Sequence, residues 1–278
     1  MEGFEEESLL LLRERVISTI IGIPVIIYLV YEGKILFLLF IIVLAVLAQY
    51  ELNRIFAGMG YRIPRFLLVS GSILFPFLAF YAPNGRESNY ILAAVTVFLL
   101  LHLMTLMFLF PRYKAGEIAA SFLGGCYCSL LLSYLILIRK MDGYGFHYLL
   151  MVFILTWCCD IGAYISGRLR GRKALCPLVS PGKTLEGAVG GLFFCVLAAV
   201  LYHYFYPHLF SYPLMILIGI VIGSAVEIGD LVESSLKRLG KIKDSGDLIP
   251  GHGGVLDRFD GLLFSAPVAY ICIKLLSL

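Results

Sequence analysis

"PLMILIGIVIGSAVEIGDLVES", residues 213–234, decides the fold class of this chain. Most of the stretch is apolar, and a helix needs about 17 to 25 such residues to cross the hydrocarbon core of a bilayer. The same stretch carries Glu227 and Asp230, although an ionisable group inside a spanning helix costs about 2.5–3.5 kcal/mol on insertion scales. We therefore expect a transmembrane helix whose acidic side chains have a function.

The rest of the chain repeats this apolar pattern. It is 60% hydrophobic and 15% charged, with a mean hydropathy of +0.92. Further apolar runs of spanning length cover 16–31, 35–52, 66–82, 90–110, 118–138, 147–167, 186–206 and 259–278. We predict an all-α integral membrane protein with about nine transmembrane helices. Residues 1–140 would form about five spans. Residues 141–278 would form a catalytic membrane domain of about four spans with two polar cytoplasmic loops.

The distribution of lysine and arginine predicts the orientation. If nine segments span, the N-terminus and the loops after the second, fourth, sixth and eighth segments share one side. These regions carry 2, 3, 2, 5 and 5 of the 22 basic residues, which leaves five for the other side. Because positive loops stay in the cytoplasm, we predict a cytoplasmic N-terminus and a multi-pass protein of the plasma or inner membrane. The net charge of +3 then reflects topology and indicates no nucleic-acid partner.

Neither the start of the chain nor its cysteines suggests a secreted protein. The opening "MEGFEEESLLLLRER" is acidic before it is basic, and no small-residue cleavage site follows the first apolar run, so we expect a retained helix instead of a signal peptide. The seven cysteines contain no C-x-x-C pair. We interpret them as small apolar core residues.

Five acidic residues are predicted to converge near the cytoplasmic face. At 1.5 Å per residue, Asp160, Glu227 and Asp230 lie about 10–15 Å below the cytoplasmic ends of their helices, while Asp257 and Asp260 begin the last helix from the same side. Any single one could instead join helices by a polar contact. Clustered carboxylates repel one another and need a cation. Mg²⁺ typically takes one or two protein carboxylates together with substrate phosphates.

A basic cluster in residues 166–191 complements these acids. It contains Arg168, Arg170, Arg172, Lys173 and Lys183, with Ser180 and Thr184 as hydroxyl donors. Such side chains near glycine-exposed amides can bind polyphosphate, although the arginines could equally be topology determinants. A P-loop is excluded, because Pro177 stands where that motif requires the glycine five residues before Gly182. Lys183 differs from the arginines, because "SPGKTLEG" opens a helix with Glu186 in its first turn. Together the two clusters indicate phosphoryl or nucleotidyl transfer to a lipid.

Two sequence blocks resemble the phosphatidate cytidylyltransferase (CDP-diacylglycerol synthase) family. The first is "SSLKRLGKIKDSGDLIPGHGGVLDRFD", residues 234–260, in which the matching positions are Ser234, Lys237, Arg238, Lys243, Asp244, His252, Gly253, Gly254, Asp257, Arg258 and Asp260. The second block matches at Asp160, Ala163, Tyr164, Gly167, Ser180, Pro181, Lys183, Thr184, Glu186 and Gly187. Gly182 departs from the lysine that the family pattern leads us to expect, so one phosphate contact would be missing.

The resemblance implies that CTP and phosphatidic acid give CDP-diacylglycerol and pyrophosphate, with Mg²⁺ required. We predict Asp230, Asp257, Lys183 and Arg258 as catalytic residues. Predicted substrate-binding residues are Ser180, Thr184, Lys237, Arg238, Lys243, Asp244, His252, Gly253 and Gly254. Asp230 and Asp257 are the predicted primary Mg²⁺ ligands, with Glu227 and Asp260 as secondary ligands, and Asp160 would position Lys183 or a water. A second cation and a homodimer are left open. The alternative functions are a CTP- or ATP-dependent lipid kinase, which would release a nucleoside diphosphate, and a polytopic transporter.

Overall fold

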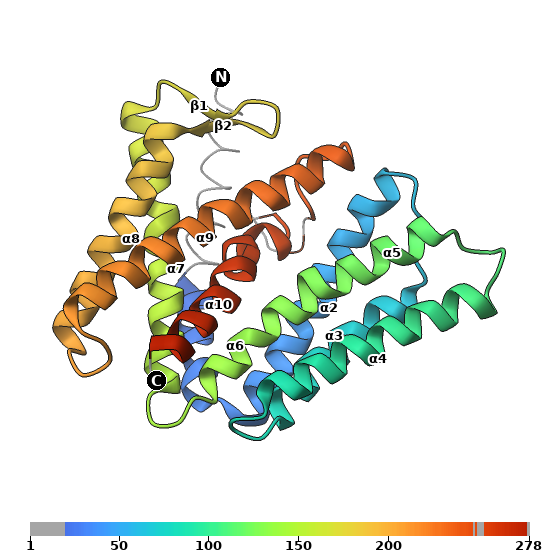
Figure 1. Ribbon diagram of the computed structural model, residues 1–278. Coiled ribbons are helices and arrows are strands. Elements are labelled where there is room, and N and C mark those ends of the chain that lie inside the picture. Colours follow the sequence, from blue (N-terminus) through green and yellow to red (C-terminus); the bar gives the residue numbers. More distant parts are fainter. Residues whose placement is uncertain (1–19, 247, 249–252, 277–278) are drawn as a thin grey trace.

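The computed structural model describes residues 20–246, 248 and 253–276, and its helices pack side by side into a bundle (Figure 1). After a first helix, Ile20–Glu32, the helices are α2 (Lys34–Gly58), α3 (Arg65–Tyr81), α4 (Glu87–Phe108), α5 (Ala115–Gly124), the π-helix η1 (Gly125–Leu130), α6 (Leu131–Arg139), α7 (Gly145–Arg170), α8 (Leu185–Phe205), α9 (Tyr212–Leu239) and α10 (Leu256–Leu276). Strands β1 (Ala174–Cys176) and β2 (Ser180–Thr184) form an antiparallel hairpin that pairs Ala174 with Thr184 and Cys176 with Ser180.

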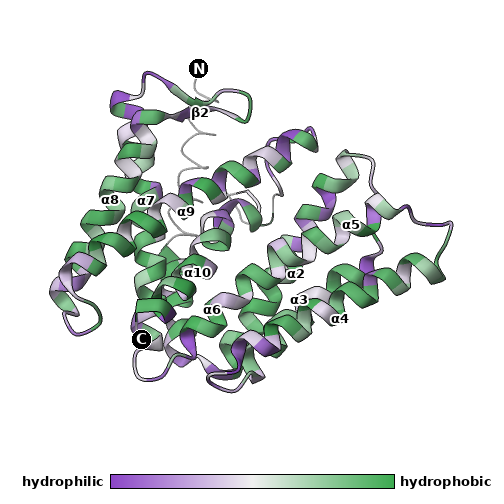
Figure 2. Cartoon of the chain, in the orientation of Figure 1, coloured by the Kyte–Doolittle hydropathy of each residue, from purple (hydrophilic) through white to green (hydrophobic). Residues whose placement is uncertain are grey.

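The helices have the length and composition of membrane spans. Within the described residues, seven helical stretches are long and apolar enough to cross a bilayer, with α5, η1 and α6 forming one of them, and Ile20–Glu32 and α3 are shorter apolar helices. These nine stretches coincide with the nine predicted segments, of which residues 16–19 lie outside the described part. Figure 2 shows apolar residues along the helices and polar ones concentrated at their ends. The predicted all-α multi-pass membrane fold is therefore confirmed, and all seven cysteines are free and at least partly buried in it. The number of crossings and the side of the N-terminus stay predictions.

Small and polar residues hold the N-terminal helices together around η1. A Cβ atom at Gly125 would lie 2.3 Å from the Phe98 ring, so α4 can approach η1 this closely only because residue 125 has no side chain. In the same layer, Gln49 Nε2 donates to Ser129 Oγ at 2.7 Å, and the hydroxyls of Ser72 and Ser129 lie 3.3 Å apart. Because buried polar groups are costly unless they are hydrogen-bonded, these contacts link α2, α3 and η1 in one arrangement.

Two basic residues tie helices together where α6 ends. Arg139 Nε donates to the carbonyl of Val30 at 2.6 Å, and its Nη2 donates to that of Tyr31 at 2.8 Å. Lys140 Nζ donates to the carbonyls that end α3, including that of Ala82 at 2.7 Å. Burial lowers the pKa of Lys140, and the nearby Glu87 carboxylate opposes the shift. Cations at helix C-termini satisfy unpaired carbonyls and complement the helix dipole. Arg139 and Lys140 therefore have a structural role where the predicted N-terminal region, residues 1–140, ends.

Helix α2 also packs against the C-terminal helices. A Cβ atom at Gly58 would lie 2.2 Å from the carbonyl oxygen of Gly240, and one at Gly240 would lie 2.7 Å from the carbonyl oxygen of Ile55. The end of α2 therefore crosses the end of α9 with backbone nearly touching backbone. This contact brings the N-terminal region next to the segment that connects α9 with α10.

The hairpin between α7 and α8 was not predicted from the sequence. It lies at one end of these two helices (Figure 1) and leads directly into α8. Thr184 Oγ1 accepts a hydrogen bond from the Gly187 amide at 3.1 Å, which makes Thr184 the N-cap of α8. Glu186, placed in the first turn as expected, accepts hydrogen bonds from the Arg172 and Lys173 amides. The strand β2 thus presents Lys183 immediately before a capped helix start.

Candidate active site

A cavity of about 770 Å³ opens among α7, the hairpin, α8, α9 and α10. It brings together most of the predicted site residues. Those that line it are Lys183, Thr184, Glu227, Asp230, Lys237, Asp244, Asp257, Arg258 and Asp260, together with Asp160. They come from α7, β2, α9, α10 and the connection between α9 and α10. The predicted juxtaposition of an acidic and a basic cluster is therefore present in the fold.

One face of α7 forms a polar wall of the cavity. Asp160, Tyr164 and Arg168 follow one another at intervals of four residues, and all three line the cavity. Arg168 Nη1 donates to the Tyr164 hydroxyl at 2.7 Å. The close approach of α8 depends on Gly187, where a Cβ atom would lie 3.1 Å from the carbonyl oxygen of Ala163. The glycine lets the start of α8 pack closely against α7.

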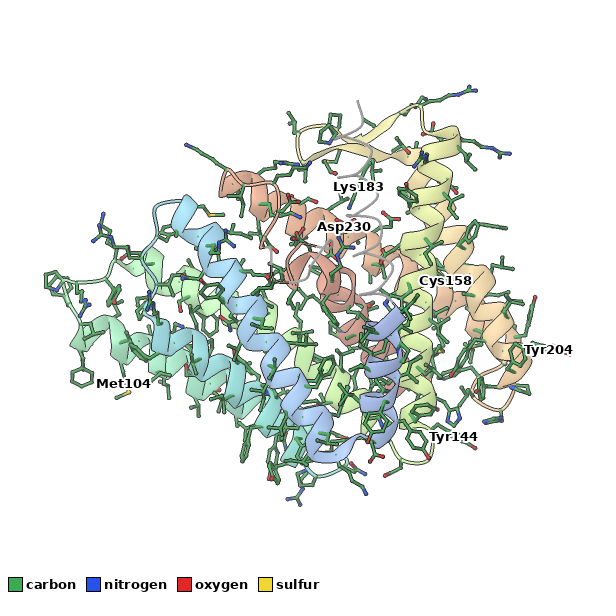
Figure 3. All side chains as sticks on the ribbon, turned by 180° about the vertical axis from the view of Figure 1, so that it is seen from behind. Met104, Tyr144, Cys158, Lys183, Tyr204 and Asp230 are labelled. Carbon is green, nitrogen blue, oxygen red and sulfur yellow. The ribbon has the colours of Figure 1, made fainter. Side chains whose placement is uncertain are left out.

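Lys183 and Asp230 form an ion pair across the cavity, between β2 and α9 (Figure 3). Their side chains are 21% and 35% exposed. One turn earlier on α9, Glu227 Oε1 is buried and has no hydrogen-bond partner among the described residues. Gly191 on α8 leaves room for it, because a Cβ atom there would lie 2.6 Å from that oxygen. A buried acceptor without a partner is rare in proteins, and it indicates a place for a bound water or cation.

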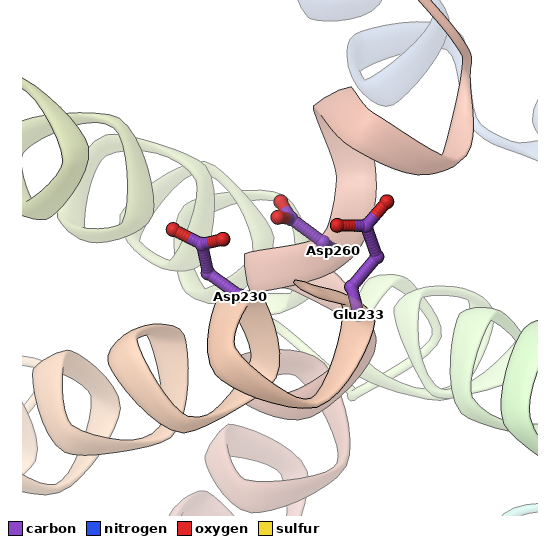
Figure 4. Close-up of side chains that lie close together, drawn as sticks. All are labelled: Asp230, Glu233 and Asp260. Atoms are coloured by element: carbon purple, nitrogen blue, oxygen red, sulfur yellow. The ribbon is translucent and has the colours of Figure 1, made fainter. Parts of the chain in front are cut away.

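Three carboxylates gather beside the cavity, and two of them, Asp230 and Asp260, line it. Asp230 and Glu233 from α9 and Asp260 from α10 point toward one another (Figure 4), and one oxygen from each lies within 4.8 Å of the other two. Hard oxygen donors in this arrangement suit Mg²⁺. Glu233 was not among the predicted residues. Its spacing of four from Lys237 is typical of an exposed ion pair on a helix, yet its side chain is 0% exposed.

Lys237 and Asp257 form the neighbouring part of the site. Lys237 Nζ lies 2.6 Å from Glu233 Oε2 and 2.7 Å from Asp257 Oδ1. Asp257 Oδ2 accepts hydrogen bonds from the amide and the hydroxyl of Ser245, at 3.0 and 2.9 Å, and from the Gly254 amide at 3.0 Å. Both oxygens of Asp257 thus face protein donors. Within the three-carboxylate group, Asp230 is paired with Lys183 and Glu233 with Lys237.

The remaining predicted residues that the structure describes do not line the cavity. Arg238 Nε donates to the carbonyl of Val179 at 3.0 Å, which ties the end of α9 to the hairpin. Ser180 begins β2, and Lys243 is exposed. Gly253 has a φ of +82°, a conformation that glycine adopts readily. Gly254 is buried beside Ser245, and His252 lies outside the described residues.

Comparison with known proteins extends the resemblance over nearly the whole chain. The model of the cytidylyltransferase family matches residues 13–276. The chain is 33% identical over 274 residues to the phosphatidate cytidylyltransferase of Bacillus subtilis (strain 168), covering 96% of this chain and 99% of that protein. The proteins of the same name from Staphylococcus saprophyticus and Staphylococcus aureus (strain N315) are 31% and 30% identical, each over 94% of this chain and 99% of their own length. The family resemblance inferred from the two motifs is confirmed.

Proposed function

This chain belongs to the cytidylyltransferase family, and on that premise we propose that it transfers CMP from CTP to phosphatidic acid, giving CDP-diacylglycerol and pyrophosphate. The observation that carries the proposal is the cavity, in which Lys183, Lys237 and Arg258 face a cluster of carboxylates at one end of an apolar helix bundle. A lipid substrate can reach such a site from the bilayer and a nucleotide from water. The lipid kinase and transporter alternatives are not favoured.

The proposed reaction needs no covalent intermediate on the protein. A phosphate oxygen of phosphatidic acid forms a new bond to the α-phosphorus of CTP. The bond from that phosphorus to the oxygen bridging to the β-phosphate breaks, and pyrophosphate leaves with the electron pair. Lys183 and Arg258 would hold CTP phosphates through charge-assisted hydrogen bonds. Cations already in place where negative charge develops also stabilise the transition state.

The sequence predicts Asp230 and Asp257 as the primary Mg²⁺ ligands, with Glu227 and Asp260 as secondary ones. Because both oxygens of Asp257 face protein donors and Asp260 converges on Asp230, we propose instead that Mg²⁺ is held at Asp230 and Asp260, with Glu227 and Asp257 as further ligands or orienting groups. The converging oxygens of Asp230, Glu233 and Asp260 and the unpartnered oxygen of Glu227 fit a hard cation. When bound, the ion would neutralise the departing pyrophosphate. Because Mg²⁺ usually takes only one or two protein carboxylates, the others leave room for a second cation.

Asp230→Asn and Asp257→Asn test the metal assignment. Each substitution keeps the shape of the side chain and removes its charge, so each variant should insert normally and lose most of its activity. Activity should be measured across a range of Mg²⁺ concentrations. Near-native turnover of either variant at limiting Mg²⁺ would remove that residue from the set of ligands.

We also propose that the protein lies in the inner membrane with the cavity facing the cytoplasm. Four basic residues, Arg168, Lys183, Lys237 and Arg258, line the cavity, and positive segments remain cytoplasmic. On this orientation CTP reaches Lys183 directly. Phosphatidic acid would approach along lipid-facing residues of α8 such as Leu185, Val189 and Phe193, which are exposed.

Product analysis tests the proposed function. Purified full-length protein in vesicles that contain phosphatidic acid, given CTP and Mg²⁺, should release pyrophosphate and CDP-diacylglycerol in equal amounts. Formation of CDP together with a phosphorylated lipid would instead identify a kinase. Uptake of a solute without pyrophosphate release would identify a transporter.

A further inference from the structure

Glu51 on α2 is a completely buried carboxylate, 0% exposed, that does not line the cavity. Its Oε1 accepts a hydrogen bond from the Val255 amide at 2.9 Å. Its Oε2 accepts from the Leu256 amide at 2.7 Å and from the Ser245 hydroxyl at 2.9 Å. None of the ion pairs among the described residues includes Glu51. Burying a charge without a counter-ion is costly, so hydrogen bonds to these donors are what stabilise it here.

The partners of Glu51 are the residues that place Asp257. Val255 and Leu256 supply N–H groups at the start of α10, where a helix has no internal acceptors, and a negative charge there is favourable. Ser245 contacts Asp257 as well: its amide donates to Asp257 Oδ2, and its hydroxyl lies 2.9 Å from both Glu51 Oε2 and Asp257 Oδ2, which share its single proton. One carboxylate from the N-terminal half of the chain therefore holds both the start of α10 and the serine that fixes Asp257.

Two glycines, Gly246 and Gly254, leave the space that the Glu51 carboxylate occupies. A Cβ atom at Gly246 would lie 2.6 Å from Glu51 Oε1. One at Gly254 would lie 2.0 Å from Ser245 Oγ and 2.5 Å from Glu51 Oε2. Real Cβ atoms do not approach other atoms so closely, so both positions need glycine as long as Glu51 stays in place. The contact between α2 and the start of α10 thus depends both on the Glu51 carboxylate and on the two glycines that leave room for it.

We propose that Glu51 is a positioning residue for the cytidylyl transfer. Through Ser245 and the first amides of α10 it sets the direction in which Asp257 and Arg258 enter the cavity. The inference rests on the proposed function. It gives α2, an N-terminal helix, a part in ordering the active site in addition to its place in the membrane bundle.

Glu51→Gln is the direct test, and Glu117→Gln is its matched control. Glu117 is likewise a buried carboxylate outside the cavity lining that accepts two backbone hydrogen bonds. Its donors are the amides of Arg62 at 3.0 Å and Lys114 at 2.7 Å, and not those of α10. In Glu51→Gln the amide NH₂ replaces an acceptor that faces N–H and O–H donors. A misplacement of about 1 Å can cost about 100-fold in rate, so we expect kcat to fall by about ten- to 100-fold. Glu117→Gln should retain wild-type kcat.

Two further readouts separate positioning from general destabilisation. Amide hydrogen exchange should increase at residues 254–257 in Glu51→Gln and not in Glu117→Gln. Mg²⁺-dependent activity should show a changed Mg²⁺ requirement only in Glu51→Gln. If Glu51→Gln fails to insert, Ser245→Ala replaces it. This small change leaves the amides of α10 bonded to Glu51 and removes the hydroxyl shared with Asp257, so it should lower kcat while exchange at residues 255 and 256 stays native.

The outcomes distinguish this inference from the proposed function. If the wild-type protein releases no pyrophosphate from CTP and phosphatidic acid, the proposed function fails. If the wild type is active and Glu51→Gln keeps kcat and native exchange at residues 254–257, the positioning role is refuted. Wild-type kcat in Ser245→Ala would equally refute the route from Glu51 to Asp257.

Discussion

Replacing Lys183 by alanine should tighten Mg²⁺ binding while weakening CTP binding. In the structure, the Lys183 ammonium is paired with Asp230, the residue to which we assign the metal. A cation that binds at Asp230 must therefore displace Lys183 or tolerate its positive charge. When CTP binds, the same ammonium is expected to turn to its phosphates. The substitution thus removes a competitor of the metal and a ligand of the nucleotide together.

The size of each effect can be worked out from the ion pair. Its side chains are 21% and 35% exposed, so solvent screens the attraction, and measured exposed pairs contribute roughly 0.2–1 kcal/mol. Taking the upper end, about 1 kcal/mol, Mg²⁺ should bind about fivefold more tightly, since about 1.4 kcal/mol corresponds to a factor of ten. A hydrogen bond to a charged group contributes about 1.5–3 kcal/mol, so the CTP requirement should rise by at least about tenfold.

The assay should separate the two ligands. Mg²⁺ binding can be followed without nucleotide through Mn²⁺ competition, and CTP dependence through pyrophosphate release at saturating Mg²⁺. Lys173→Ala is the charge-matched control, because Lys173 is exposed and does not line the cavity. If Lys183→Ala binds Mg²⁺ no more tightly than Lys173→Ala does, Lys183 does not compete for the metal site and the assignment of Asp230 loses its support.

Three more predictions follow from other contacts. Gly254→Ala should lose activity because the new methyl group would lie 2.0 Å from a buried hydroxyl, whereas Gly22→Ala, with nothing within 4 Å of its Cβ position, should remain active; equal activity would contradict the close packing at α10. Lys237→Met should lower the unfolding temperature, because it leaves two carboxylates with side chains 0% and 9% exposed without their cation, and breaking a buried pair costs about 3–5 kcal/mol. An unchanged midpoint in thermal denaturation would count against this. Cysteines engineered at residues 142 and 241 should be labelled from outside intact cells only at 142; the reverse pattern would overturn the orientation and the access of CTP from the cytoplasm.

Local patterns in the sequence were enough to predict the membrane fold and to locate the polar site residues. A helix in a bilayer satisfies its own backbone hydrogen bonds, so a run of apolar residues specifies a span without reference to any distant residue. Charges inside such runs are exceptional, which is why Asp160, Glu227 and Asp230 could be identified before any contact was known. The motif residues Lys183 and Asp257 then line one cavity with them.

Other features depended on contacts between distant parts of the chain. The hairpin consists of strands of three and five residues, too short to be recognised by alternation of polar and apolar residues, and Glu186 and Arg238 hold it in place from other elements. Glu233 has the spacing of a surface ion pair, and only the packing of α10 against α9 shows that it is buried beside Asp260.

The role of Glu51 could be recognised only from contacts between distant parts of the chain. It ends a predicted span as an acidic residue beside polar neighbours, and nothing within the helix pairs with it. Its hydrogen-bond donors lie 194 to 205 residues further along the chain. Hydropathy and helical spacing report on neighbours within a few residues. The role of a buried carboxylate, by contrast, depends on which hydrogen-bond donors the tertiary fold places next to it.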